Sequence, residues 1–522
     1  MIFRSRIPDV AIPDVSYPAF ILQHVRERGD QPVLVDGPSG RSLTLGQIAT
    51  GARRVAAGLA RRGFAKGDIL AIYSPNLPEY ALAFHGPVMA GGIVTTVNPL
   101  YTADELRYQL LDTGATYVVT VPAFLERARE GARDTAVREI FVFGEAEGAL
   151  PFADLLARDE APPSVAIDPA ADLAALPYSS GTSGRPKGVM LTHRNLVAIT
   201  RQVEAQGQFD ANWRTLGVLP FFHIYGLVVL MNFPLYFGGL CVTMPRFDLA
   251  EFLRLVQEHR LTHLYLVPPL VLALARHPLV DRFDLSSVKL VNSGAAPLDE
   301  GVQRACAERL GCLVTQGYGM TETSLACHTT PQDPALARSG AVGLTLPGME
   351  SKLVDVVTGA ELGLGERGEI CVRGPNVMRG YWNDPEATAR TIDADGWLHT
   401  GDIGYADGDG YFYVVDRVKE LIKYKGLQVA PAELEGLLLA HPAVADAAVI
   451  PSPDEEAGEV PKAFLVLRQP VEPTELMGWV AARVAPHKKI RRLEVVDAMP
   501  RSAAGKILRR VLVERERASR GG

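Results

Sequence analysis

A loop rich in glycine and hydroxyl side chains is the part of this sequence best suited to chemistry. Residues 178–188 read YSSGTSGRPKG and end in Lys187 and Gly188. The backbone N–H groups, hydroxyl groups and ammonium group of such a loop can surround the oxygen atoms of a polyphosphate. No G-x-x-x-x-G-K-[ST] register fits, so the loop is not a Walker A motif. The composition predicts a phosphate-binding loop, with a plain surface loop as the alternative.

Six further runs place small, hydroxyl-bearing or charged residues close together along the chain. They are the segments 221–226 (FFHIYG), 292–297 (NSGAAP), 317–322 (GYGMTE), 400–402 (TGD), 416–426 (DRVKELIKYKG) and 500–506 (PRSAAGK). Taken singly, each also has a plain structural interpretation, as a buried histidine, a loop, a helix cap, a turn or a solvated charge run. Their use in chemistry therefore depends on the fold bringing them together.

In their order along the chain, these runs resemble the motifs of the adenylate-forming superfamily, which joins acyl-CoA synthetases, 4-coumarate–CoA ligases, firefly-type luciferases and peptide-synthetase adenylation domains. The resemblance covers almost the whole chain and, around FFHIYG and VKELIKYKGLQVAPAE, is nearest to the 4-coumarate–CoA ligase branch. It implies an acid–CoA ligase that converts a carboxylic acid, ATP and CoA to acyl-CoA, AMP and pyrophosphate. The reaction would pass through an acyl-adenylate, with Mg²⁺ as cofactor.

The resemblance also implies where the nucleotide and the metal ion bind. Tyr318 would stack on adenine, Thr321 would bond the α-phosphate, and Glu322 would hold Mg²⁺. Asp402 would accept hydrogen bonds from the ribose hydroxyl groups, and Arg417 would contact the ribose. The full set expected to bind ATP or AMP is Ser179, Ser180, Gly181, Thr182, Ser183, Gly184, Lys187, Ala295, Ala296, Gly317, Tyr318, Gly319, Thr321, Asp402 and Arg417.

A pocket for the acid is implied in the same way. Its expected walls are His223, Tyr225, Ser293, Gly294, Gly319 and Leu325, and the expected catalytic residues are Lys506, His223, Thr321 and Lys423. Residues 323–327 read TSLAC, where plant 4-coumarate ligases carry a Gly-Pro-Val-like run. The acid is therefore left open between a hydroxycinnamate, another aryl acid and a medium-chain fatty acid.

One fixed site cannot serve both half-reactions, because the thiol must enter where pyrophosphate has left. The last two runs resemble a hinge and a mobile domain. Residues expected to act at the hinge or with CoA are Lys419, Lys423, Lys425, Gly426 and Gln428. Lys506 is the expected catalytic lysine and should meet the acid only in the adenylating arrangement. Ala504 stands where the family often has serine, which removes one hydroxyl contact.

Alternating helix and strand patterns in the first third of the chain predict the scaffold that positions these runs. Thr44 begins a helix with a capping box to Gln47, and Gly63 ends it. Strands are expected at 68–75, 93–97 and 116–121, and helices at 79–90 and 103–111. Such repetition with short connections is typical of a doubly wound α/β sheet.

The pattern changes near Val342, where short strands with glycine and aspartate turns predict a small β subdomain. The last part of the chain predicts an α+β domain, with helices at 431–440 and 473–484 and strands at 444–450, 462–467 and 493–497. We therefore expect an α/β protein with a large N-terminal domain of doubly wound mixed sheets over 1–418. A smaller, mobile α+β domain should follow over 419–522, with the hinge near 417–420.

Composition limits the class of protein further. The 522 residues include 53 Lys and Arg against 60 Asp and Glu, a net charge of −7, which gives no reason to expect nucleic-acid binding. The 5 cysteines are odd in number and form no C-x-x-C pair, which suits a reducing compartment. With no signal-peptide pattern and no peroxisomal tripeptide, the cytoplasm is the expected location. The sequence does not indicate an oligomeric state.

The stretch 215–245 contains no Asp, Glu, Lys or Arg and is long enough to cross a bilayer. However, Pro220, Asn232, Pro234 and the pair Gly238-Gly239 interrupt it. We therefore predict a buried segment that lines a pocket rather than a membrane span.

Two alternatives to a CoA ligase remain at this stage. The same adenylation chemistry could load a carrier protein, or a protein of the same fold could bind a nucleotide without catalysis. The joint presence of Glu322, Asp402 and Lys506 argues against the second. The sequence contains no G-x-S-x-G elbow, and this argues against a hydrolase. The G-x-G-x-x-G at 363–368 leads into an expected strand, which argues against a dinucleotide site.

Overall fold

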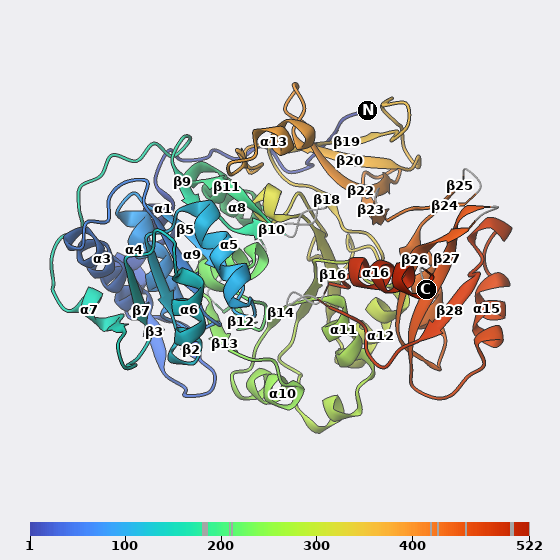
Figure 1. Ribbon diagram of the computed structural model, residues 1–522, viewed down its shortest axis with the longest axis horizontal. Coiled ribbons are helices and arrows are strands. Elements are labelled where there is room, and N and C mark those ends of the chain that lie inside the picture. The colour runs from blue at the N-terminus through green and yellow to red at the C-terminus, as the bar shows by residue number, and fades with distance from the viewer. Residues whose placement is uncertain are drawn as a thin grey trace.

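The computed structural model describes residues 1–179, 186–207, 209, 212–417, 420–424, 427–454, 457–501 and 506–520. Several members of the expected site lie outside these residues: Ser180, Gly181, Thr182, Ser183, Gly184, Lys419, Lys425, Gly426 and the side chain of Gln428. The described residues form five β-sheets, and the last of these, with its own helices, lies at one end of the longest axis (Figure 1).

A nine-stranded sheet in the N-terminal part has the doubly wound pattern that the sequence predicts. Its strands, in spatial order, are β10 (Tyr178–Ser179), β11 (Lys187–Thr192), β9 (Leu173–Ala175), β5 (Ile93–Val97), β4 (Ile69–Tyr73), β6 (Tyr117–Thr120), β7 (Glu139–Val142) and β8 (Leu150–Pro151), with β21 (Gly380–Tyr381) beside β11. Strands β5, β4, β6 and β7 are parallel, whereas β11 runs antiparallel to its neighbours. The sheet is therefore mixed.

Helices alternate along the chain with the strands of this sheet, as expected. They are α3 (Leu45–Arg61), α4 (Tyr80–Met89), α5 (Ala103–Thr113), α6 (Leu125–Ala132), α7 (Ala153–Leu156) and α8 (His193–Glu204). The predicted capping box at the start of α3 is present, because Thr44 and Gln47 each accept a backbone N–H of the other. The helix ends two residues before Gly63, whose φ of 85° is left-handed.

Two smaller sheets and three helices also belong to the large region. One consists of β12 (Arg214–Gly217), β13 (Leu240–Thr243), β2 (Pro32–Asp36) and β3 (Ser42–Thr44), and the other of β14 (His263–Leu266), β15 (Leu290–Ser293), β16 (Leu313–Tyr318), β17 (His328–Thr329) and β18 (Leu344–Thr345). The helices are α10 (Leu249–Glu258), α11 (Pro268–Arg276) and α12 (Glu300–Leu310). Strands β14, β15 and β16 are parallel, so the NSGAAP and GYGMTE runs meet at their carboxyl ends.

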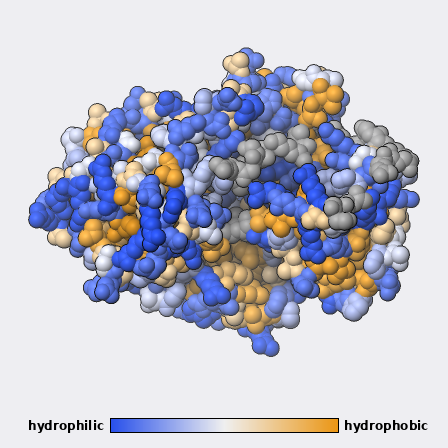
Figure 2. Space-filling model, viewed as in Figure 1, coloured by the Kyte–Doolittle hydropathy of each residue, from blue (hydrophilic) through white to orange (hydrophobic). Residues whose placement is uncertain are grey.

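The uncharged stretch 215–245 is a buried part of this region, as predicted. It contains a π-helical segment, Gly226–Asn232, followed by α9 (Phe233–Phe237), and every residue of the π-helical segment is buried. Among the helices of the described residues, none has the length and apolar character that a membrane span requires. The face shown in Figure 2 is mostly hydrophilic, with apolar residues interspersed among hydrophilic ones.

A small antiparallel sheet and the C-terminal sheet complete the chain. The first has the order β1 (Phe3–Arg4), β19 (Glu350–Val354), β20 (Gly368–Arg373), β22 (Leu398–Ala406) and β23 (Phe412–Arg417), with α13 (Pro385–Thr391) nearby. The second contains β25 (Leu427–Val429), β24 (Ile422–Tyr424), β27 (Gly458–Leu467), β26 (Val444–Asp454) and β28 (Arg492–Val495), with α14 (Pro431–Ala440), α15 (Pro473–Ala481) and α16 (Arg509–Arg520). The chain changes sheet between Arg417 and Ile422, within the segment predicted as a hinge.

Candidate active site

A cleft of about 970 Å³ lies where the large region meets the last segment of the chain. Arg501, Lys506, Leu508 and Arg510 line it from the C-terminal side. The expected site residues that line it are Ser179, Lys187, His223, Tyr225, Gly294, Ala295, Gly317, Tyr318, Gly319, Thr321, Glu322, Leu325, Arg417 and Lys506. Runs that are far apart in the sequence therefore meet in one cleft.

Four other expected residues lie outside the lining of the cleft. Asp402 lies directly behind it, in contact with two lining residues. Ser293 is buried, and the adjacent residue Asn292 lines the cleft instead. This follows from strand geometry, because successive side chains of β15 point to opposite faces of the sheet. Ala296 and Lys423 are exposed.

Asp402 joins the two residues expected at adenine and ribose. The Tyr318 hydroxyl donates a hydrogen bond of 2.7 Å to Asp402 Oδ2, and Arg417 Nε donates one of 3.1 Å to Oδ1. Strands β22 and β23 place Asp402 directly opposite Arg417. Burial, followed by the negative charge of Asp402, raises the pKa of Tyr318 well above its usual value, so Tyr318 stays a hydroxyl donor.

Glu322 is held by hydroxyl groups on one oxygen only. Ser179 Oγ and the Tyr381 hydroxyl each donate to Glu322 Oε1 at 2.9 Å. Among the described residues, no hydrogen bond reaches Oε2. A carboxylate oxygen of this kind in the lining of the cleft fits Mg²⁺, which is usually held by one or two carboxylates together with phosphate oxygens.

Two cationic side chains face the same part of the cleft. Lys187 Nζ lies 4.9 Å from the centroid of the Tyr381 ring and 3.8 Å from Asp384 Oδ2. Burial, and then the nearby charge of Arg417, lowers the pKa of Lys506, while Asp402 and Glu322 act in the opposite direction. Asp402 and Glu322 are the carboxylates expected at the ribose and at Mg²⁺. Lys506 therefore lies near the expected position of the nucleotide phosphates.

His223 is a neutral histidine in this site. Its burial, and then the positive charge of Lys506, lowers its pKa to about 3. His223 Nδ1 accepts the backbone N–H of Tyr225 at 3.3 Å, so the proton of the neutral ring lies on Nε2. His223 is therefore a hydrogen-bond donor at its other nitrogen and not a cation.

The part of the cleft nearest Tyr225 is lined by aromatic and apolar side chains. The Tyr225 hydroxyl donates to Asn292 Oδ1 at 3.0 Å, and Asn292 Nδ2 donates to Thr315 Oγ1 at 3.0 Å. A Cβ atom on Gly294 would lie 2.8 Å from the Tyr225 ring, so this position needs glycine. At Gly319 a Cβ atom would lie 2.0 Å from the Leu325 carbonyl oxygen, which makes glycine necessary there too.

Several lining residues were not predicted from the sequence. They include Phe209, Val229, Phe233, Tyr265, Asn292, Glu369, Tyr381 and His399. Asn292 belongs to the predicted NSGAAP run, and Val229 and Phe233 belong to the segment predicted to line a pocket. The others stand outside the predicted motifs and gave no local signal, because the fold brings them to the cleft from distant segments.

The fold and the cleft together define an adenylate-forming enzyme of two parts. Residues 21–382 match the family model of the AMP-binding enzymes, and residues 433–506 match that of the AMP-binding enzyme C-terminal domain. The chain belongs to the AMP-binding enzyme family. It is an ATP-dependent acid–thiol ligase, and the resemblance stated from its motifs is confirmed.

Individual relatives are similar along nearly their whole length. The chain is 44% identical to 4-coumarate–CoA ligase 5 of Oryza sativa subsp. japonica, covering 98% of this chain and 96% of that protein. It is 43% identical to 4-coumarate–CoA ligase 1 of Solanum tuberosum, with the same two coverages of 98% and 96%.

Solved structures share its fold. An anthranilate CoA ligase in complex with anthranoyl-AMP has a TM-score of 0.90 at 26% identity, covering 98% of this chain and 99% of that one. ATP-bound MatB from Rhodopseudomonas palustris has a TM-score of 0.88 at 31% identity, covering 96% and 99%.

Proposed function

We propose that this enzyme joins an aryl carboxylic acid of the 4-coumarate type to CoA through an acyl-adenylate, using ATP and Mg²⁺. The observation that carries the proposal is the position of Lys506. This lysine comes from the C-terminal part of the chain, yet it lines the same cleft as His223 and Glu322 of the large region. The arrangement of groups is the one that the adenylation step needs.

Adenylation requires two anions, a carboxylate and a triphosphate, to approach each other. The charge of Lys506 near the α-phosphate and that of Lys187 near the leaving phosphates would offset their repulsion. Thr321 and the Nε2–H group of neutral His223 would donate hydrogen bonds to the reacting oxygens. Mg²⁺ held by Glu322 would add positive charge at the phosphates when bound. The loop that contains Ser180, Gly181, Thr182, Ser183 and Gly184 would bind the same phosphates.

Thioester formation would use a second arrangement. Lys423 is exposed outside the cleft, on β24 of the C-terminal sheet. We assign residues 1–418 to the nucleotide-binding domain and 419–522 to a domain that swings about Lys419. Rotation would remove Lys506 and bring Lys423, Lys425, Gly426 and Gln428 toward the incoming thiol.

The acid is assigned from the relatives and from the aromatic lining of the cleft near Tyr225. Tyr265 lines the cleft and its hydroxyl lies beside Gln332 and Trp213. The other aromatic residues of this part of the lining are Phe209, Phe222, Tyr225 and Phe233. A flat aromatic acid would pack against these rings, whereas the flexible chain of a fatty acid would not match them.

A panel of acids tests the proposal. AMP and acyl-CoA formation would be measured with 4-coumarate, cinnamate and octanoate, each with and without CoA. We expect 4-coumarate and cinnamate each to exceed octanoate in kcat/KM by about tenfold or more. Equal values for 4-coumarate and octanoate would contradict the aryl assignment. AMP formation without acyl-CoA would instead favour an enzyme that loads a carrier protein.

The compartment is part of the same proposal. The five cysteines are all free in the structure, which suits a reducing environment. ATP and CoA are used there as well, so we place the enzyme in the cytoplasm.

A further inference from the structure

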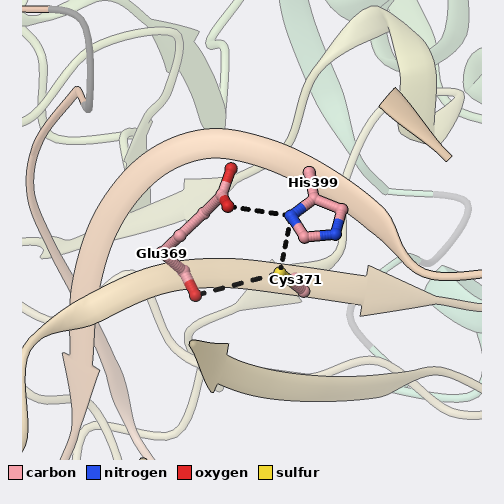
Figure 3. A group of neighbouring side chains, drawn as sticks. All are labelled: Glu369, Cys371 and His399. Atoms are coloured by element: carbon pink, nitrogen blue, oxygen red, sulfur yellow. Dashed lines mark hydrogen bonds and ion pairs between the residues drawn. The ribbon is translucent and has the colours of Figure 1, made fainter. Parts of the chain in front are cut away.

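A cluster of three side chains next to the expected ribose-binding run, residues 400–402, has no role in the reaction as described so far. Glu369 and Cys371 lie on β20, and His399 lies on the neighbouring strand β22 (Figure 3). His399 Nδ1 lies 2.8 Å from Glu369 Oε2 and 3.5 Å from Cys371 Sγ. Glu369 and His399 line the cleft.

His399 is held between two carboxylates. Besides Glu369 at Nδ1, Asp393 Oδ2 lies 3.6 Å from His399 Nε2. The hydrogen bonds to Cys371 and Glu369 raise the pKa of His399 to about 10. The ring is thus an imidazolium with both nitrogens protonated, and each proton has an anionic oxygen in front of it.

Glu369 uses its other oxygen to hold the backbone of the ribose-binding run. Glu369 Oε1 accepts the N–H of Gly401 at 2.9 Å. Gly401 has a left-handed φ of 71°. Next to it, Thr400 Oγ1 donates to the Ile370 carbonyl at 2.7 Å and accepts the N–H of Asp402 at 3.1 Å. Each of these hydrogen bonds fixes the backbone just before the Asp402 side chain.

The register explains why the backbone needs such support. His399 pairs with Cys371 and Ile403 pairs with Glu369, so residues 400–402 stand opposite Ile370 alone. The run that carries Asp402 is therefore a bulge in β22. Bulges re-aim a side chain next to a site, and their unpaired backbone groups need other partners.

We propose that His399 and Glu369 are positioning residues for the ribose of ATP. The imidazolium of His399 orients the Glu369 carboxylate, which holds the bulge at Gly401 and thereby aims Asp402 at the ribose hydroxyl groups. The inference rests on the proposed assignment of Asp402 to the ribose. A bound metal ion is the competing interpretation, because the ligand atoms of Glu369, Cys371 and His399 lie within 4.8 Å of one another. The direct 2.8 Å contact between His399 Nδ1 and Glu369 Oε2 favours the ion pair, because it has the length of a hydrogen bond.

The test compares ATP with 2′-deoxy-ATP and 3′-deoxy-ATP in pyrophosphate release. His399→Gln should raise KM for ATP by about tenfold with kcat nearly unchanged, the size of effect expected for a group that supports a binding contact. A deoxy-ATP that lacks the hydroxyl group bound by Asp402 has already lost this contact. Its KM should therefore change much less between the wild type and His399→Gln. A purely structural role would weaken ATP and both analogues equally. His24→Gln is the control, because His24 forms a 3.2 Å pair with Glu27 away from the cleft.

Two further variants separate the possible failures. If Asp402→Asn still discriminates ATP from both deoxy-nucleotides as the wild type does, the ribose assignment itself is wrong. If Asp402→Asn loses discrimination while His399→Gln and Glu369→Gln keep it, the positioning role is wrong. Glu369→Gln also covers the case in which His399→Gln fails to fold. Stoichiometric Zn²⁺ in the purified protein that Cys371→Ser removes would overturn the proposal in favour of a metal site.

Discussion

At the scale of single residues, Glu322 gives the most direct prediction about the metal ion. Both of its hydrogen bonds, from Ser179 and Tyr381, reach Oε1, which leaves Oε2 as the atom we assign to Mg²⁺. Glu322→Gln should therefore lower pyrophosphate release by about 10²–10³-fold and raise the Mg²⁺ concentration needed for half the maximal rate. A Mg²⁺ titration of the rate measures both effects, with exposed Glu308→Gln as the control. An unchanged half-saturating Mg²⁺ concentration would exclude Glu322 as a ligand.

Residue by residue, the sequence predicted those parts of the site that lie in contiguous runs. Tyr225, Glu322 and Lys506 each stand in a motif and line the cleft as expected. Tyr265 and Tyr381 were missed because each comes from a separate strand with no motif around it. Their role emerges only from the three-dimensional pairing of distant segments.

At the scale of elements, the π-helical segment and β15 together shape the pocket for the acid. Tyr225 precedes the first and bonds Asn292 on the second, so the two elements hold the ring across the pocket. Tyr225→Ala should enlarge the cavity and shift preference toward bulkier acids. The measurement is kcat/KM over a series of aryl acids of increasing size. The same ranking of acids in the variant and the wild type would contradict the assignment of Tyr225 to the wall of the pocket.

The elements themselves were predicted well where their ends carry strong signals. The helix predicted at 431–440 is α14, with the same bounds, and the strand at 93–97 is β5. The strand predicted at 444–450 instead continues to Asp454, through Pro451 and Pro453. Pairing with β27 extends the strand to Asp454, which stands opposite Gly458. Long-range pairing of this kind has no local signal in the sequence.

At the scale of the whole molecule, four histidines with lowered pKa values predict how stability depends on acid. Burial lowers the pKa of His85 and His193 to about 4 and that of His223 and His328 to about 3. Between these values and the usual value of about 6.5, the unfolded chain binds more protons than the folded one. The free energy of unfolding should therefore fall as pH decreases from about 6.5 to 4.

Melting temperatures across this pH range measure the effect. His328→Gln, which keeps a donor toward Ser351 Oγ, should make the fall less steep, whereas His24→Gln, at a half-buried position, should not. Parallel curves for His328→Gln and the wild type would contradict the assignment of this dependence to buried neutral histidines.

The organisation of the whole chain into two parts is the central claim, and it depends on where Lys506 acts. Lys506 lies in the cleft with Thr321 and Glu322, whereas Lys423 lies outside it on the C-terminal sheet. If the C-terminal domain alternates, Lys506 serves adenylation only, and other residues of the same domain serve thioester formation.

The measurement that tests this most directly separates the two half-reactions in Lys506→Ala. Acid- and ATP-dependent pyrophosphate release should fall by about 10²-fold or more, because a charge that offsets two approaching anions is lost. The same variant supplied with pre-formed acyl-AMP should form acyl-CoA at nearly the wild-type rate. Lys289→Ala, at an exposed position outside the cleft, is the matched control and should leave both steps unchanged. Equal slowing of both half-reactions in Lys506→Ala would contradict the account and favour a single static site.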